Sequence, residues 1–454
     1  MNEDESAGRA DPGSDIGPEG AGVPASIAPS DRHAAPSDRH VASGVRADAH
    51  GSASRPPPAR GRARDLGIVI GLMPTGPTNS IVDVPGVKVG HATVWRDEPK
   101  PPVGRGTARS GVTAILPGDL ETLTSHPAHA GVAVLNGAGE VSGRTQIDEL
   151  GAFEGPILLT STMAVGRVYD AAITILIDER PEADADHWMI PVVAECSDAF
   201  LNDARHVQVD LDDVRAAIDT ARGAEAGPVA SGIIGAGTGM VCHELKGGIG
   251  SASRRVVPAH DEAPTLVPTA KQAAGPDAYT VAALALTNYG WLEQLVIDGV
   301  RVGPTLVAEG YARRSGPDVH RPESGSVIVV VATDAPLDAR QLQRLARRAG
   351  LGIARTGGIA GNGSGDIFLA FTTAGRVSHR AGPLVERTLL ADAYLDPLFA
   401  AAAEVTEEAA IDSLVAAATV QGRDGHLIHG LPLGRVVQLL QAAGRPAHLP
   451  IEMG

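Results

Sequence analysis

A single serine hydroxyl stands within a run of small residues, Gly361-Asn362-Gly363-Ser364-Gly365-Asp366. The apolar segment that follows at once, residues 367–371, is typical of a buried strand. Small neighbours let another backbone, or a substrate, come close to the hydroxyl. The pattern therefore predicts that Ser364 is accessible on a rigid element. A nucleophile needs that placement, and so does a peptide bond at which the protein cuts itself.

The local sequence does not supply the usual activation of a serine. A nucleophile elbow requires glycine two positions before the serine, where Asn362 stands, and no histidine lies beside it in the sequence. Another route is cleavage of the Gly363–Ser364 bond, in which the hydroxyl attacks the preceding carbonyl and water releases the ester. Ser364 would then be N-terminal, and its α-amine, with an ordinary pKa of roughly 7.7–8.0, could act as the base. The residues alone leave a second interpretation open, a solvated serine at a glycine-rich strand entry.

Composition and motifs argue against several classes of function. The formal net charge of −16 disfavours a nucleic-acid partner. There is no P-loop motif, and the glycine-rich segments 136–140 and 235–240 lack the spacing of a dinucleotide-binding loop. The two cysteines, Cys196 and Cys242, have no metal-ligand spacing and suggest no disulfide. We therefore expect no metal and no cofactor.

Membrane association is also disfavoured. The longest apolar stretches, such as residues 327–332, are far too short to span a bilayer. The sequence starts with acidic residues and has no apolar signal region there. We expect a cytoplasmic protein with no membrane partner.

The elements that must position the serine are a mixture of strands and helices. Apolar and alternating runs predict strands at residues 82–84, 87–90, 113–116, 131–135, 157–160, 191–194, 280–286, 326–332 and 367–371. Helical periodicity predicts helices at residues 337–349, 396–418 and 433–443, with Arg347 and Arg348 in the last turn of the first. Because strands and helices do not alternate regularly, the α+β class is favoured over a doubly wound sheet.

Composition divides the chain into a tail and one domain. Residues 1–63 are rich in small, polar and proline residues and predict a disordered tail, since little there can bury surface. The remainder, residues 64–454, is expected to be a single catalytic domain. Within it, residues 257–277 and 313–323 have the composition of inserts or mobile loops.

Several segments resemble the L-aminopeptidase/D-esterase family, which includes the β-peptidyl aminopeptidases. They occur in the family's order at residues 79–91, 111–117, 134–140, 235–240, 246–254, 287–290 and 332–337 and at the Ser364 segment. The resemblance implies a four-layer αββα sandwich, similar to N-terminal nucleophile hydrolases but differently connected. It also implies a self-processed precursor that removes N-terminal residues from short peptides, amides or esters, and a homo-oligomer of processed heterodimers.

The resemblance also assigns catalytic roles. Ser364 is the nucleophile and new N-terminus, so cleavage of the Gly363–Ser364 bond would give chains 1–363 and 364–454. The family places a hydroxyl and a carboxylate, two residues apart, near the nucleophile, and Thr406 and Glu408 on the expected helix at 396–418 fit that pattern best. The hydroxyl could relay a proton and the carboxylate could orient the amine. The alternative is a solvated acidic stripe, and two residues at 100° per residue lie far apart on a regular helix.

Four further residues are candidates for binding. Asn288 resembles the family's position for an amide that donates to the oxyanion, although an asparagine before glycine also forms turns. A carboxylate is needed to pair with the substrate's free ammonium, and we prefer Glu244 to its competitor Glu140. Lys246 would hold either carboxylate in place, or simply be solvated.

Two rival functions are consistent with the same residues. The first keeps the fold but makes the chain an amidase for non-peptide oligoamides. The second is a non-enzymatic assembly protein that has kept the fold. Self-processing would distinguish the assembly protein, and the need for a free substrate amine would distinguish the amidase.

Overall fold

The computed structural model describes residues 55–179, 189–258, 266–311 and 325–449. They belong to one compact unit, Ser52–Gly454. The predicted loop at 313–323 lies outside the described residues, as does part of 257–277. The described part of 257–277 includes a short helix, α5 (Ala270–Ala273).

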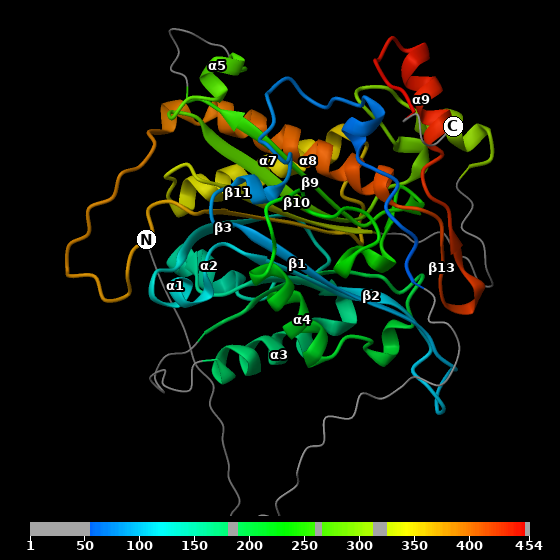
Figure 1. The fold of residues 1–454 in the computed structure, drawn as a ribbon, viewed down its shortest axis with the longest axis horizontal. Helices are drawn as coiled ribbons and strands as arrows, with labels where there is room; N and C mark the ends of the chain where they lie inside the picture. Colours follow the sequence, from blue (N-terminus) through cyan, green and yellow to red (C-terminus); the bar gives the residue numbers. More distant parts are fainter. Residues whose placement is uncertain (1–54, 180–188, 259–265, 312–324, 450–454) are drawn as a thin grey trace, which may run out of the picture. The chain divides into compact units, whose positions relative to one another are not determined.

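Two β-sheets form the centre of the unit (Figure 1). The smaller sheet has the strand order β1-β2-β5-β6, and its members are β1 (Lys88–Asp97), β2 (Thr107–Leu116), β5 (Ile157–Ser161) and β6 (Val192–Cys196). The larger has the order β4-β3-β12-β11-β10-β9, with β3 (Ala128–Gly137), β4 (Ala152–Phe153), β9 (Ile249–Val256), β10 (Tyr279–Asn288), β11 (Ser326–Thr333) and β12 (Gly365–Thr372). Both sheets are mixed, since β5–β6 and β11–β12 pair in parallel and the other pairs are antiparallel.

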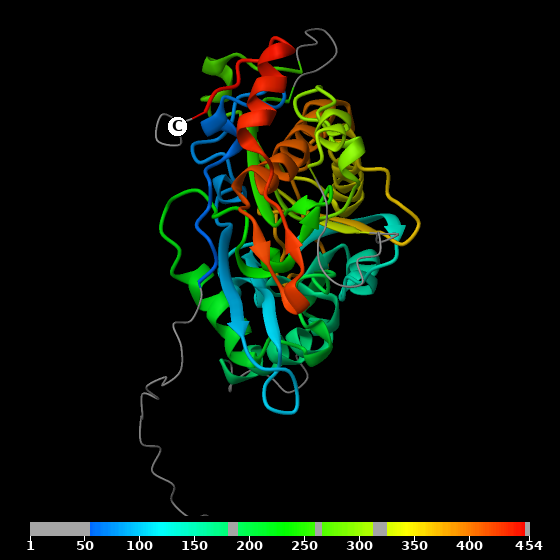
Figure 2. The ribbon, with the colours of Figure 1, turned by 90° about the vertical axis from the view of Figure 1, so that its right-hand side faces the viewer.

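Helices cover the outer face of each sheet. Helices α3 (Val165–Asp178) and α4 (Leu211–Arg222) pack on the smaller sheet, and α7 (Ala339–Arg355) and α8 (Asp396–Ala416) pack on the larger one. Figures 1 and 2 show the resulting order of layers, with the helices outside and the two sheets between them. The predicted four-layer αββα sandwich is therefore confirmed.

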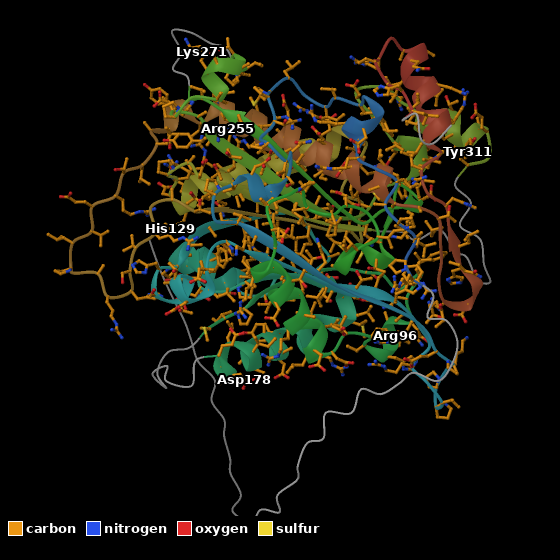
Figure 3. The ribbon with its side chains drawn as sticks, in the orientation of Figure 1. Arg96, His129, Asp178, Arg255, Lys271 and Tyr311 are labelled. Atoms are coloured by element: carbon orange, nitrogen blue, oxygen red, sulfur yellow. The ribbon has the colours of Figure 1, made fainter. Side chains whose placement is uncertain are left out.

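Shorter elements complete the unit. They are α1 (Leu120–Ser125), α2 (Arg144–Leu150), α6 (Gly303–Ala308) and α9 (Leu433–Ala442), with the hairpins β7 (Val241–Cys242)–β8 (Leu245–Lys246) and β13 (Val420–Gln421)–β14 (Leu427–Ile428). Charged side chains at the ends of the layers point outward, as Figure 3 shows for Asp178 on α3 and Lys271 on α5.

Alternation along the central strands supplies two hydrophobic cores. Ile367 and Leu369 of β12 face the core between the sheets, whereas Phe368 and Ala370 face the core shared with α7 and α8. A strand that buries both faces reads as a continuous apolar run. This explains why residues 367–371 predict a strand so clearly, and why β12 is a rigid support for the serine that precedes it.

The polar groups of α8 are satisfied by arginines from the start of the described chain. Arg62 pairs with Asp412 at 3.1 Å, and Arg64 pairs with Glu408 at 2.6 Å. The Arg60 backbone N–H also donates to the Ala416 carbonyl at 3.1 Å. The boundary at residue 63 was therefore placed too late, because charged side chains, rather than apolar burial, anchor the residues from Arg60 onward.

Other boundaries also differ from those expected. Residues 81–83 form a short 3-10 helix instead of a strand, because Ser80 and Asp83 make a reciprocal capping box. Helix α7 continues to Arg355, so Arg347 and Arg348 lie inside it and not in its last turn. Helices α3 and α4 and strand β9 were not predicted.

Candidate active site

The ends of four neighbouring strands meet at the serine. Across the larger sheet, Asn288 of β10 is opposite Ser326 of β11, Ser326 is opposite Gly365 of β12, and Gly365 is opposite Gly137 of β3. Ser364 immediately precedes β12, so it lies at the edge formed by this row. The fold thereby brings Asn288 close to the predicted cleavage bond, although 76 residues separate them in sequence.

A tight turn presents the Gly363–Ser364 bond. The Ser364 backbone N–H donates to the Gly361 carbonyl at 2.8 Å, and the Asn136 Nδ2 donates to the same carbonyl at 2.6 Å. Just upstream, Ala360 has a φ of 50°, a left-handed conformation that costs about 1–2 kcal/mol for a residue with a Cβ. The segment before the bond is thus held in a fixed and strained path.

The Ser364 side chain is buried, and its hydroxyl is not held by a hydrogen bond of standard geometry in the described chain. It is 2% exposed, and its Oγ has no hydrogen-bond partner of standard geometry among the described residues. It lines a cavity of about 300 Å³, whose wall includes Phe200, Trp291 and Arg423. A small, partly apolar cavity next to a free hydroxyl has the dimensions and chemistry of a binding site for a small side chain.

A second cavity adjoins the other side of the same bond. It measures about 400 Å³ and is lined by Gly363, Glu140 and Glu195, among others. Ser197, Asn288 and Gly325 line both cavities. The predicted cleavage bond therefore lies between two cavities, one apolar in part and one acidic.

Two carboxylates give the second cavity its acidic character. Glu195, at the end of β6, is 3% exposed and accepts hydrogen bonds from the Glu140 backbone N–H at 3.0 Å and from the Thr162 hydroxyl. Burial raises the pKa of Glu195 above its ordinary value. The Glu140 side chain is exposed at the cavity. The pair could hold a cation such as a substrate ammonium.

Asp366 is the carboxylate nearest in sequence to the nucleophile, and it lines the first cavity with Ser364. Burial raises its pKa and the Ser364 hydroxyl lowers it, with a net value of about 6. Sequence reasoning missed this residue, although its spacing of two from Ser364 at a strand entry places both side chains on one face. That spacing was the available signal.

Asn288 is oriented for a donor role. Its Oδ1 accepts a hydrogen bond from the Val241 backbone N–H at 2.8 Å, so Nδ2 is the group left to act as a donor. Both cavities contact Asn288. The amide is therefore beside the Gly363–Ser364 bond, as the predicted oxyanion role requires.

Glu244 and Lys246 lie elsewhere, so these assignments are corrected. Glu244 is in the two-residue turn between β7 and β8, where its φ of 59° suits the turn, and it accepts a hydrogen bond from the Leu292 backbone N–H at 3.1 Å. Lys246 is fully buried, and its Nζ donates to the carbonyls of Gly237, Met240 and Gly247 at 2.7–3.1 Å. It neither holds a carboxylate nor is solvated. Of the two competing glutamates, only Glu140 lines a cavity described here.

The structure does not bring Thr406 and Glu408 to either cavity. The Thr406 hydroxyl donates to the Ala402 carbonyl at 2.7 Å, within α8. Glu408 is bound by Arg254 at 2.5 Å and by Arg64 at 2.6 Å. Both side chains are committed to packing and ion pairing, because α8 is buried nearly all round. Their predicted catalytic roles are not supported by this geometry, and the acidic-stripe alternative fails too, since the stripe is buried.

No group of three or more His, Cys, Asp or Glu side chains among the described residues is arranged to hold a metal ion. None of the helices that the structure describes has both the length and the apolar character to cross a membrane.

Comparisons with known proteins agree with the geometry. The model of Peptidase family S58 matches residues 79–428. Beta-peptidyl aminopeptidase BapA from Sphingosinicella microcystinivorans is 39% identical over 395 residues, covering 85% of this chain and 93% of that protein. Among solved structures, the L-aminopeptidase D-Ala-esterase/amidase from Ochrobactrum anthropi, described as a variant of the Ntn hydrolase fold, is 39% identical with a TM-score of 0.73. It is matched over 99% of its length and 85% of this chain.

A Burkholderia beta-aminopeptidase structure is also 39% identical, with a TM-score of 0.71, and it covers 84% of this chain and 99% of its own. These relatives share the sandwich fold and extend over nearly the whole described unit. A non-enzymatic assembly role is therefore set aside. The chain is a hydrolase that belongs to Peptidase family S58.

Proposed function

We propose that this chain is a serine aminopeptidase that cleaves its own Gly363–Ser364 bond and then uses Ser364 as an N-terminal nucleophile. The observation that carries the proposal is the position of this bond, with Gly363 at one cavity, Ser364 at the other, and Asn288 at both. A hydroxyl without a hydrogen-bond partner among the described residues, a donor amide and two cavities thus meet at one peptide bond. The processed protein would consist of chains 1–363 and 364–454.

The chemistry follows from the freed N-terminus. The Ser364 hydroxyl attacks the carbonyl of the substrate's first residue, and the α-amine of Ser364 accepts its proton. The Asn288 amide donates to the oxyanion, a contribution of roughly 3–4 kcal/mol in comparable sites. The amine of the remaining substrate leaves with the proton, and water then hydrolyses the acyl-enzyme ester. The products are a free amino acid and, depending on the substrate, a shortened peptide, an amine or ammonia, or an alcohol.

We assign recognition of the substrate's ammonium to Glu140 and not to Glu244. Glu140 is exposed in the cavity beside Gly363, whereas the Glu244 carboxylate accepts from the Leu292 N–H in a turn. The relatives are named as aminopeptidases, β-peptidyl in one case and L- in another, which supports substrates with a free amine. The processed heterodimer is proposed to form a homo-oligomer in the cytoplasm. The two free, buried cysteines are consistent with that compartment.

Intact-mass spectrometry of the purified protein tests the proposal. The wild-type chain should give two species, 1–363 and 364–454, and Ser364→Ala should give one full-length species. A full-length wild-type protein that hydrolyses amino-acid amides would contradict the self-processing mechanism.

The free-amine requirement is tested with matched glutamate variants. Glu140→Gln should raise KM for amino-acid amides about tenfold or more, since a charge-assisted contact of roughly 1.5–3 kcal/mol is lost. Glu244→Gln keeps an acceptor for the Leu292 N–H and should leave KM unchanged. N-acylated amides should be poor substrates. If they react faster than free amines, the amidase of non-peptide oligoamides is the correct function.

A further inference from the structure

The buried carboxylate of Asp366 stands out because no ion pair with it is found among the described residues. Asp366 is 1% exposed, and neither of its oxygens has a hydrogen-bond partner of standard geometry among the described residues. Three other buried carboxylates face a guanidinium, Glu404 and Glu408 with Arg254 and Asp412 with Arg62. Two more, Glu195 and Asp198, accept hydrogen bonds from hydroxyl or amide groups instead. A buried carboxylate without partners costs free energy of folding. Fold stability therefore does not explain Asp366.

The Ser364 hydroxyl is placed to use the Asp366 carboxylate. The two residues are two positions apart at the entry of β12, and both line the 300 Å³ cavity. The Ser364 hydroxyl lowers the pKa of the Asp366 carboxyl, which burial raises. Its Oγ is itself buried and has no other partner in the described part of the chain. Two buried and unsatisfied groups that share a cavity next to a cleavable bond point to a proton-transfer pair.

We propose that Asp366 is the general base of the self-cleavage step, a catalytic role that rests on the self-processing function proposed above. In the uncleaved chain Ser364 has no free α-amine, so the base that serves the mature enzyme does not yet exist. Asp366 supplies the missing proton acceptor.

The step balances without any co-reactant except water. The Ser364 Oγ forms a bond to the Gly363 carbonyl carbon as its proton passes to the Asp366 carboxylate. The Gly363–Ser364 C–N bond then breaks, and Asp366 returns the proton to the departing Ser364 nitrogen. Water hydrolyses the resulting ester, leaving a Gly363 carboxylate and a Ser364 with free hydroxyl and free amine.

Two ionisable side chains that face Asp366 do not change charge near neutral pH, whereas Asp366 does. Burial raises the pKa of the Cys196 thiol of β6 and of the Tyr289 phenol after β10 well above their ordinary values, so both are neutral near pH 7. Arg423, on the hairpin β13–β14, is on the cavity wall. The pKa of about 6 for Asp366, raised by burial, makes it a stronger base than an ordinary aspartate and keeps it ionised at neutral pH.

The test is the rate of chain cleavage after cell-free synthesis of the full chain. Gel densitometry follows appearance of fragment 364–454 between pH 5 and pH 8.5. The wild-type rate should rise with pH through about 6 and then level, because the ionised carboxylate is the active form. Asp366→Asn should lower the rate by about 10² or more and remove this limb. Asp366→Glu should recover part of the rate. Asp334→Asn, at the opposite end of β11, keeps an acceptor for the Thr280 N–H and should behave as wild type.

Each outcome decides a separate point. If the wild-type chain does not cleave, both the proposed function and this inference fail. If it cleaves and Asp366→Asn cleaves within threefold of it, the inference alone fails and the proposed function survives. Thermal unfolding of Ser364→Ala with and without Asp366→Asn shows whether the variant folds. Should it not fold, the wild-type profile still decides, because a rate independent of pH between 5 and 7 contradicts a base at Asp366.

Discussion

Arg254 is the buried cation on which the polar side of α8 depends, and replacing it should be among the most damaging single changes. Its side chain is fully buried on β9. It donates to Glu404 at 2.8 Å, to Glu408 at 2.5 Å, and to the carbonyls of Ser253 and Ile70. The prediction concerns Arg254→Leu in a Ser364→Ala background, so that the chain stays whole during unfolding.

The magnitude follows from what remains after the change. Removing one partner of a buried ion pair costs roughly 3–5 kcal/mol, because the other charge is left buried. Here Glu404 keeps the backbone N–H groups of Leu72 and Met73, and Glu408 keeps Arg64 and Asn79. We therefore expect the lower end, about 3 kcal/mol at pH 7.5, measured by urea unfolding. The matched control Arg435→Leu breaks a solvent-screened pair with Glu309 and should change the free energy of unfolding far less than Arg254→Leu does.

The pH dependence of this loss has a definite sign. Burial alone would raise the pKa of Glu408, but Arg254, Arg64 and Asn79 together hold it below its ordinary value. The depressed pKa contributes stability that is present above the ordinary carboxyl pKa and lost as pH falls through the folded value. Without Arg254 the Glu408 carboxylate loses an attractive partner while its burial remains, so its pKa is higher than in the wild type. The variant therefore recovers part of its free energy of unfolding as this carboxylate becomes protonated. The difference should shrink between pH 7.5 and pH 5. A loss under 1 kcal/mol, or one that grows at pH 5, would refute the reasoning.

Three further predictions concern the oxyanion donor, packing and the thiols. Asn288→Ala should lower kcat about 10²–10³-fold, with little change in KM in a steady-state assay, because the amide acts on the transition state; an unchanged kcat contradicts that role. Gly250→Ala should destabilise the chain by at least about 3 kcal/mol in urea, since the new Cβ would lie 1.8 Å from a backbone carbonyl of α8. By contrast Gly166→Ala on α3 meets nothing within 4 Å and should stabilise by about 0.5 kcal/mol. Both cysteines are buried, so Ellman's reagent should detect no thiol in the native protein and two after denaturation, and a fast-reacting native thiol would contradict the burial.

The residues of the central strands were predictable because local patterning and tertiary burial agree there. The runs at residues 326–332 and 367–371 are apolar throughout, and both strands are covered on both faces. The start of the fold was not predictable in the same way. Arg60 and Arg62 have no apolar pattern, and their anchoring depends on carbonyl and carboxylate groups more than 340 residues away.

The candidate active site was also predictable from the sequence only in part. The glycine context of Ser364 and the turn-like Asn288 were visible in the sequence, and the sheet register joins them. Glu195 was not visible, because a glutamate inside the β6 run has no distinctive spacing, and only the fold places it beside Gly139 and Gly365. Glu408 was a plausible catalytic residue by its spacing from Thr406. Its structural role is fixed by the ion pair with Arg254, which lies on strand β9 and is far from Glu408 in sequence.

In the proposed mechanism, the nucleophile is the hydroxyl of a serine that the protein's own cleavage makes N-terminal. The most direct test is acid quenching of the purified enzyme during turnover of an amino-acid ester, followed by mass spectrometry of its peptides. We predict that the acyl group is found on the peptide that begins at Ser364, on its hydroxyl. An acyl group on any other residue, or on Ser364 within an uncleaved chain, would contradict this mechanism.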